Sequence, residues 1–323
     1  MTNDSISLEL QPRDYSLLLG LFESRVMTAK QAGQLHFEGK HEYAKRRLRQ
    51  LKTAGFIGTR ARRVNEPAVL FLTRVGFSHL KTEGLLQGYP TLSSADFENR
   101  ASVSNLTLQH ELEIMDVKAA IVAAMRGSQR LKLAEFSTWP ALHQFETSLP
   151  ASAESVLVKP DGFIRIQERD AEGGEFDFEH AFFLELDRSS ETQGTLLNKA
   201  LCYRQFYRTG GFATRNGATA REFERFPFLV LIVMKSAERR NIIAERFAAN
   251  NPAILSQVWL TTLAEVTSNP LGQIWITPAD HRAVVSGTRF EKSSADGKGG
   301  YRRSAEREKF VETHIKKRAL LES

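Results

Sequence analysis

The sequence lacks the features that mark disulfide-stabilised or membrane-spanning proteins. Cys202 is the one cysteine among 323 residues, so no disulfide can form within the chain, which fits a reducing compartment. The longest apolar run, residues 226–234, is far shorter than the roughly 20 residues needed to cross a bilayer. The first residues show no basic stretch followed by an apolar one. We therefore expect a cytoplasmic protein without a membrane partner, in which Cys202 packs inside a helix.

Several catalytic and binding patterns are also missing. The chain has no internal repeat, no phosphate-binding glycine loop, no Cys and His set with zinc spacing and no Ser-His-Asp order. Hydrophobic residues make up 41% and charged residues 25%, ordinary values for a globular protein with a core. A length of 323 residues suits two domains.

The charge is distributed unevenly along the chain. Residues 1–83 hold 14 Lys and Arg against 8 Asp and Glu, and residues 287–323 hold 10 against 6. Residues 84–286 hold 20 against 24, so both ends are basic and the middle is not. Such asymmetry is expected when terminal modules meet a polyanion and a central domain carries an acidic site.

The first 83 residues predict three helices and a hairpin. Apolar residues are spaced as on one helix face over residues 12–23, and Thr28 to Gln31 form a capping-box pattern that opens a second helix. A third helix over residues 40–52 ends at Gly55, and residues 56–60 and 69–73 read as paired strands. Three helices followed by such a hairpin resemble a winged helix, as does the ending Leu72-Thr73-Arg74-Val75-Gly76.

That resemblance implies DNA binding by the third helix and the hairpin turn. Six of the thirteen residues in the third helix are Lys or Arg, and such a helix usually enters the major groove while the hairpin touches phosphates. We therefore expect DNA contacts from Lys45, Arg46, Arg49, Lys52, Arg60, Arg62 and Arg63. A solvated basic face is the alternative, and winged helices also dock proteins.

Residues 84–100 lack periodicity and are rich in turn formers, so they are expected to form a linker. The predicted core domain covers residues 101–286, with helices over 103–125, 195–207 and 238–249 and strands over 131–139, 226–234, 257–262 and 273–277. Residues 287–323 are predicted to be a basic, flexible tail with a marginal helix over 304–321, which adds phosphate contacts or solubility.

Two central runs, residues 156–166 and 181–188, read as strands that carry Asp161, Glu185 and Asp187. If they pair, Asp161 faces Glu185, and Asp187 shares a face with Glu185. Three carboxylates so close suggest a divalent cation between them, because like charges are otherwise destabilising. The alternative is a hairpin with acids on its solvent face.

Pro160-Asp161 followed by Phe183-Leu184-Glu185-Leu186-Asp187-Arg188 resembles the PD-(D/E)xK motif of restriction-endonuclease-like nucleases. With Lys199 and Tyr203 on a following helix, the pattern is similar to the replication-relaxation family of mobile-element proteins. The resemblance covers residues 10–280. It implies a mixed α+β or α/β fold, in which an N-terminal winged helix-turn-helix precedes a restriction-endonuclease-like mixed-sheet core.

In an active member of this class, Asp161 and Glu185 would hold Mg²⁺ or Mn²⁺, and the metal would activate a water against the phosphate. Asp187 stands where the motif usually has lysine. It would therefore be a further metal ligand, or the site would lack its usual cation. Lys199 on the following helix is the candidate to replace that cation. Lys199 is alternatively a structural partner of Asp187 or Glu191. The family also suggests supporting roles for His110, Glu111 or Glu113, Glu135 and Tyr203, each of which is otherwise a packed or surface residue.

Three functions are compatible with the sequence. We favour a DNA-binding protein of the replication-relaxation type, acting in the replication or mobilisation of a plasmid or mobile element together with replication or mobilisation proteins. The second is an active metal-dependent nicking endonuclease. The third is a transcriptional regulator with a degenerate nuclease-fold domain. The oligomeric state is left open, with a homodimer as one option.

Overall fold

The computed structural model describes residues 8–61, 66–149, 155–169, 176, 178–189, 191–286 and 305–321. The chain divides into two compact units. The first comprises residues 1–127 with 137–142, and the second comprises residues 128–136 with 143–323. Arg62 and Arg63, which the sequence assigns to DNA contacts, lie outside the described residues.

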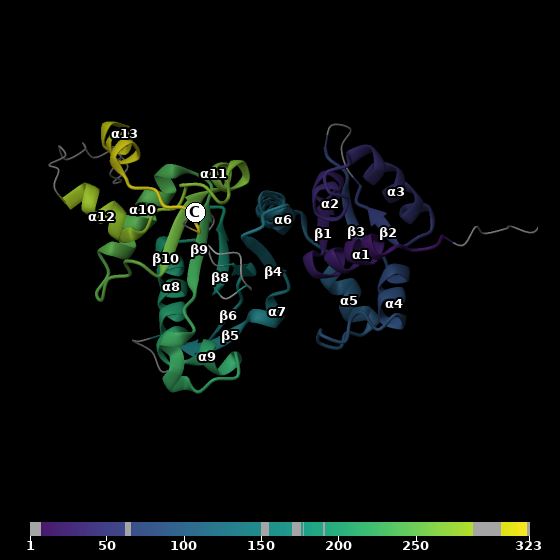
Figure 1. Ribbon diagram of the computed structural model, residues 1–323, viewed down its shortest axis with the longest axis horizontal. Helices are drawn as coiled ribbons and strands as arrows, with labels where there is room; N and C mark the ends of the chain where they lie inside the picture. Colours follow the sequence, from purple (N-terminus) through teal and green to yellow (C-terminus); the bar gives the residue numbers. More distant parts are fainter. Residues whose placement is uncertain are drawn as a thin grey trace, which may run out of the picture. The chain divides into compact units, whose positions relative to one another are not determined.

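The first unit contains the predicted three helices and hairpin (Figure 1). Its elements are α1 (Pro12–Ser24), β1 (Val26–Thr28), α2 (Ala29–His36), α3 (His41–Thr53), β2 (Ile57–Thr59), β3 (Val69–Leu72), α4 (Arg74–Thr82), α5 (Ser94–Ala101) and α6 (Asn105–Met125). The strands form an antiparallel sheet in the order β1, β3, β2. The paired strands β2 and β3 confirm the predicted hairpin.

Local signals explain where α2 and α3 begin and end. The Thr28 hydroxyl accepts a hydrogen bond from the Gln31 amide at 3.1 Å, and the Gln31 side chain accepts one from the Thr28 amide at 2.7 Å. This is the predicted capping box. Beyond α3, Gly55 takes a φ of +81°, and the Phe56 amide donates to the Leu51 carbonyl at 3.0 Å. Glycine adopts that left-handed conformation without a Cβ penalty, so the helix ends there.

The core of the first unit extends beyond residue 83. Leu17, Leu21 and Phe22 of α1 belong to the same buried cluster as Phe97 of α5 and Met115 of α6. The predicted linker over 84–100 thus contains α5, and α6, expected to open the core domain, is grouped with the first unit. Sequence composition missed α5 because its eight residues include only Phe97 as a large apolar side chain.

The rest of the chain forms a mixed sheet with helices. The elements are β4 (Leu131–Ser137), α7 (Pro140–His143), β5 (Phe145–Ser148), β6 (Ser155–Val158), β7 (Gly162–Glu168), β8 (Phe178–Asp187), α8 (Gln193–Arg208), α9 (Gly211–Arg215), the 3₁₀ helix η1 (Ala220–Arg225), β9 (Leu229–Met234), α10 (Ala237–Ala248), β10 (Val258–Thr262), α11 (Leu263–Ser268), α12 (Pro278–Ser286) and α13 (Ala305–His314). The five-stranded sheet has the order β10, β9, β8, β7, β4. β7 and β8 are antiparallel, whereas β8, β9 and β10 are parallel. The predicted mixed α+β class is confirmed.

The run over residues 156–166 is not one strand as predicted. β6 ends at Val158 and pairs with β5, while β7 begins at Gly162 and pairs with β8. Pro160 lies in the break, and proline cannot donate a ladder hydrogen bond. The predicted strand over 273–277 is likewise reduced to the isolated bridges of Trp275 and Ile276.

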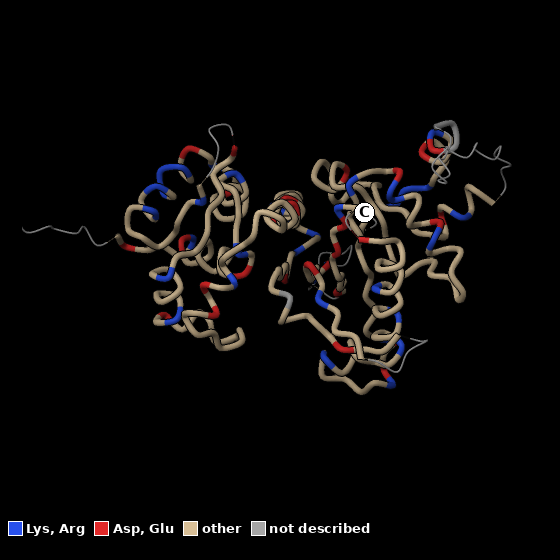
Figure 2. The backbone as a smooth tube through the Cα atoms, turned by 180° about the vertical axis from the view of Figure 1, so that it is seen from behind, with Lys and Arg blue, Asp and Glu red and all other residues tan. Residues whose placement is uncertain are grey.

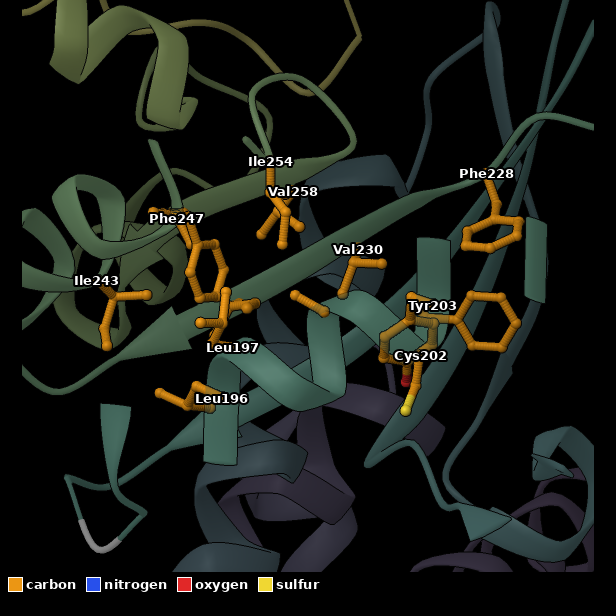
Figure 3. Packing of buried hydrophobic residues seen from close by; sticks show 14 of the residues in the cluster. Leu196, Leu197, Cys202, Tyr203, Phe228, Val230, Ile243, Phe247, Ile254 and Val258 are labelled. Atoms are coloured by element: carbon orange, nitrogen blue, oxygen red, sulfur yellow. The ribbon is translucent and has the colours of Figure 1, made fainter. Parts of the chain in front are cut away.

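One face of the five-stranded sheet is covered by α8 and α10. Leu196, Leu197 and Tyr203 of α8 pack with Phe247 of α10 and Val230 of β9 (Figure 3). Cys202 is buried on α8, as the sequence analysis expected. This packing fixes α8 against the strands that carry the acidic residues.

The predicted flexible tail is packed against the second unit over residues 305–321. Val311 and Ile315 belong to its core, and Leu320 is 5% exposed. Arg318 forms two hydrogen bonds with Asp280, at 2.7 and 2.8 Å. Lys317 pairs with Glu265 at 2.6 Å. Carboxylates of the same unit thus bind two of the three basic residues 316–318, which had been considered for phosphate contacts.

Within the part of the chain that the structure describes, no helix has the length and apolar character needed to span a membrane.

Candidate acidic site and nucleic-acid interface

The acidic site lies at the end of the β7–β8 pair where β7 begins and β8 ends. Gly162 pairs with Leu184, so the next position of this antiparallel register sets Asp161 opposite Glu185. The Asp161 amide donates to the Leu184 carbonyl at 3.1 Å, and its side-chain Oδ2 accepts from the Leu186 amide at 2.8 Å. The predicted pairing of these two runs is confirmed.

Two side chains of α8 bind Glu185. The Lys199 Nζ donates to Glu185 Oε2 at 2.7 Å, and the Tyr203 hydroxyl donates to Glu185 Oε1 at 2.6 Å. Lys199 and Tyr203 are four residues apart and therefore share a helix face. Lys199 also approaches Glu191 at 3.7 Å. The structure thus brings together Asp161, Glu185, Lys199 and Tyr203, as the family resemblance implied.

Burial controls the protonation of this group. Glu185 is 2% exposed, and burial raises its pKa to about 7; Lys199 opposes that rise and Asp161 adds to it. Burial alone would lower the pKa of Lys199, but the carboxylates of Glu185 and Asp161 outweigh it and raise that pKa. Burial also raises the pKa of Tyr203, with Glu185 adding to the effect. Lys199 is therefore a cation, and Tyr203 is a neutral hydrogen-bond donor.

Asp187 makes a separate ion pair. Its Oδ2 accepts from Arg239 Nε of α10 at 2.7 Å, and its Oδ1 accepts from the Ser189 amide at 2.9 Å. Arg239 also donates to the Glu191 carbonyl at 2.6 Å. Of the two structural partners considered for Lys199, Glu191 is therefore found, whereas Asp187 pairs with Arg239 instead.

The remaining predicted residues of the core have other partners. Glu135 on β4 contacts the His143 ring at 2.7 Å and Arg165 at 3.7 Å. Glu111 on α6 pairs with Arg25 at 2.9 Å. Glu113 accepts a hydrogen bond from Gln109 at 3.0 Å, and His110 is partly buried on the same helix. Glu135, Glu111 and Glu113 thus each bind a residue other than Lys199 or Tyr203.

The basic face of α3 is exposed as predicted. Lys45, Arg46, Arg49 and Lys52 are all exposed, and Figure 2 shows blue segments along α3. The opposite face buries Ala44, Leu48 and Leu51. Arg60 differs from the prediction, because its guanidinium donates to the Val103 carbonyl at 2.6 Å and to Asn105 at 3.1 Å. These bonds hold Arg60 against the N-terminus of α6.

Comparison with known protein families gives one result. A family model described as replication-relaxation matches residues 18–221, which is more than half of the chain. The chain belongs to the replication-relaxation family. No curated protein and no solved structure shows significant similarity to it.

The match spans both the basic helix and the acidic site of this replication-relaxation protein. It includes α3 as well as Asp161, Glu185, Lys199 and Tyr203. Asp187 also lies within it, whereas its partner Arg239 lies beyond residue 221. Family membership supports a role in replication or mobilisation.

The fit of a divalent metal can be judged from the donor groups. Among the residues that the structure describes, no three His, Cys, Asp or Glu side chains are grouped so that they could hold a metal ion. Asp187 is bound to Arg239, and both oxygens of Glu185 already accept hydrogen bonds. These side chains therefore do not form the three-carboxylate site that the sequence suggested.

Arg239 is the residue that the sequence analysis missed. It lies 52 residues after Asp187 in the chain, and no motif connects the two. Its position in the first turn of α10, on the helix that follows β9, was the only available signal. A cation near the start of a helix is not by itself enough to identify an ion-pair partner.

Proposed function

We propose that this protein binds double-stranded DNA and acts in replication initiation or mobilisation of a plasmid or mobile element. The first unit would recognise the DNA, and we assign it as a winged helix. The observation that carries the proposal is the exposed basic face of α3, formed by Lys45, Arg46, Arg49 and Lys52. Family membership supports the biological setting.

The fold holds α3 firmly enough to present that face. Arg47, on its buried side, donates to both carboxylate oxygens of Asp14 of α1, with a shortest distance of 2.6 Å. Asp14 is fully buried and Arg47 is 8% exposed. This pair and the buried Leu48 and Leu51 fix the rotation of α3, so its other cations remain directed to solvent. A rigid helix is what major-groove recognition requires.

The second unit is proposed to be a restriction-endonuclease-like core. The support is its strand order, the antiparallel β7 and β8 followed by the parallel β9, with α8 between β8 and β9. The residues of the suspected motif, Asp161 and Glu185, stand opposite each other in that register. In the favoured account this core is a scaffold for replication or mobilisation proteins.

DNA binding is tested by fluorescence anisotropy with duplexes from the replicon that encodes the protein. We expect Arg46→Ala with Arg49→Ala to weaken binding at least tenfold, since each charged contact contributes about 1 kcal/mol or more. Arg74→Ala is the matched control, because Arg74 is an exposed arginine of the same unit, on α4. Equal binding by the double variant and the wild type would overturn the proposal.

A metal-dependent nicking endonuclease is the second candidate. The observation that favours it is the group of Asp161, Glu185 and Lys199, two acids and a cation as in the PD-(D/E)xK pattern. Supercoiled plasmid is incubated with wild type or Asp161→Ala, with and without Mg²⁺ or Mn²⁺. Relaxation that requires the metal and disappears in the variant would establish this candidate. Relaxation that is equal in both proteins, or absent from both, would remove it.

A further inference from the structure

A groove beside α3 is lined by a basic side chain, Lys30, that the sequence patterns did not single out. It has a volume of about 440 Å³ and lies among α2, α3 and the strands β2 and β3. Lys30 lines it from the first turn of α2, and Lys45, Arg49 and Lys52 line it from α3. Leu48 and Leu70, both less than 10% exposed, supply apolar surface. The groove therefore combines cations from two helices with an apolar base.

The charge of this groove is largely uncompensated. Its lining contains four Lys and Arg side chains against one carboxylate, Glu42. Within the described part of the chain, no ion pair involves Lys30, Lys45, Arg49 or Lys52. Lys30 interacts electrostatically with Asp116 of α6, whose carboxylate accepts a hydrogen bond from the Gln31 side chain at 2.7 Å. An external polyanion is thus the natural complement.

The residues of α3 divide between this groove and the surface outside it. Lys45, Arg49 and Lys52 follow the spacing of one helix face and line the groove. Arg46 is not among the lining residues, and its guanidinium lies over the Tyr43 ring, 5.5 Å from the ring centre. Arg46 therefore faces a part of the surface outside the groove.

We propose that the groove holds the sugar-phosphate backbone of duplex DNA, that Lys30 contacts a phosphate from the α2 side, and that Arg46 reads bases. The inference rests on the proposed DNA binding. Apolar surface beside cations suits deoxyribose next to phosphate. Single-stranded nucleic acid is usually held by large aromatic side chains on which bases stack. Among the residues that the structure describes, the groove lining includes the His41 ring but no Phe, Tyr or Trp. Backbone contact positions a protein without reading sequence.

The test compares Lys30→Ala, Arg46→Ala, Arg49→Ala and the control Lys81→Ala, an exposed lysine of α4. Affinities are measured by anisotropy with duplexes of several sequences, each at several salt concentrations. Lys30→Ala is expected to lower the affinity for every duplex by a similar factor of about five to ten. It should also reduce the slope of log affinity against log salt by about 0.9, the value for one lost phosphate contact. Arg46→Ala is expected to change the ranking of the sequences.

Several results would overturn the inference. In the first, Lys30→Ala keeps the wild-type affinity and salt slope while Arg49→Ala binds DNA more weakly. That result would show that Lys30 does not contact a phosphate, and it would leave the proposed function intact. A change confined to one sequence would make Lys30 a base contact. Displacement of the duplex by poly-glutamate at equal charge concentration would make the groove a site for an acidic peptide. Wild-type binding by all variants would instead remove the proposed DNA binding itself.

Discussion

Arg46 and Arg47 are adjacent in the sequence but have opposite surroundings. Arg46 is exposed, whereas Arg47 is buried against the fully buried Asp14. Their hydrogen-bond partners, not their chemistry, separate a surface cation from a structural one. Helix periodicity alone cannot identify a buried arginine, because the partner of Arg47 lies 33 residues away on another helix.

This contrast predicts different stabilities for two neighbouring variants. Arg47→Met leaves Asp14 as an unpaired buried carboxylate and is expected to lower the free energy of unfolding by about 3–5 kcal/mol. Arg46→Met is expected to change it by about 0.5 kcal/mol or less, as for most surface substitutions. Urea unfolding followed by circular dichroism compares the two. Similar losses in both variants would contradict the assigned role of Arg47.

His36 gives the first unit a dependence on pH. Burial lowers its pKa from 6.5 to about 3, with Lys118 adding to the effect, and its Nδ1 lies 2.9 Å from the Ser16 hydroxyl. Between those two values the unfolded chain binds a proton that the folded unit does not. The neutral His36 therefore costs the folded unit no stability above pH 6.5, and the free energy of unfolding falls as the pH decreases from 6.5 toward 3.

The expected loss at pH 5 is up to about 2 kcal/mol relative to pH 7.5. His36→Asn removes the titrating group, so this part of the pH dependence should disappear even if the variant is less stable at every pH. Urea unfolding at several pH values between 5 and 7.5 measures both proteins. An unchanged slope of stability against pH in the variant would show that other groups cause the dependence.

Elements with strong local signals could be predicted from the sequence, and elements made by tertiary contacts could not. α1, α2 and α3 follow from apolar spacing, a capping box and Gly55. The pairing of β7 with β8 follows from two β-favouring runs joined by turn formers. The short strands β1 and β5 carry too few residues for any periodicity, and the packing of residues 305–321 depends on partners far away in the chain.

The candidate site was predictable to a similar extent. Alternation along the strands was enough to place Asp161 near Glu185, and the family resemblance supplied Lys199 and Tyr203. The separation of Asp187 from them was not predictable. Asp187 and Glu185 are two residues apart on one strand. Nevertheless, Asp187 pairs with Arg239 of α10, whereas Glu185 pairs with Lys199 of α8.

The packing of α13 depends on a buried arginine of α10. Arg240 is fully buried and pairs with Glu265 at 3.1 Å and with Glu312 of α13. Arg240→Met is expected to release α13, because Glu312 then loses its main cation. Amide hydrogen exchange over residues 305–321 should rise at least tenfold. Arg246→Met, an exposed position on the same helix, is the control, and equal protection in both variants would contradict this role.

The same contacts predict the effect of acid on this segment. Despite burial, Lys317 and Arg240 hold the pKa of Glu265 below its usual value, and Arg240 does the same for Glu312. Arg318 likewise lowers the pKa of Asp280 against the effect of burial. Carboxylates with lowered pKa values stabilise the folded state above their usual pKa, and this contribution is lost as the pH falls through the lowered values. Amide exchange of residues 305–321 should therefore increase below pH 4 before the protection of β8 is lost.

At the scale of the whole molecule, the chain combines a basic first unit with an acidic site in a second unit. The first unit carries 17 Lys and Arg against 13 Asp and Glu. The exposed cations include Lys45, Arg46, Arg49 and Lys52 of α3, whereas Glu185, Asp187 and Glu265 of the second unit are bound by cations of that unit. We therefore propose that the first unit recognises DNA.

Selection of binding sites from a pool of random duplex DNA tests that central claim most directly. The wild-type protein and the double variant carrying Arg46→Ala and Arg49→Ala are each given the same pool, and the recovered duplexes are sequenced. We predict that the wild type enriches one sequence motif and that the double variant enriches none. Enrichment of the same motif by both proteins, or no enrichment by the wild type, would contradict the account.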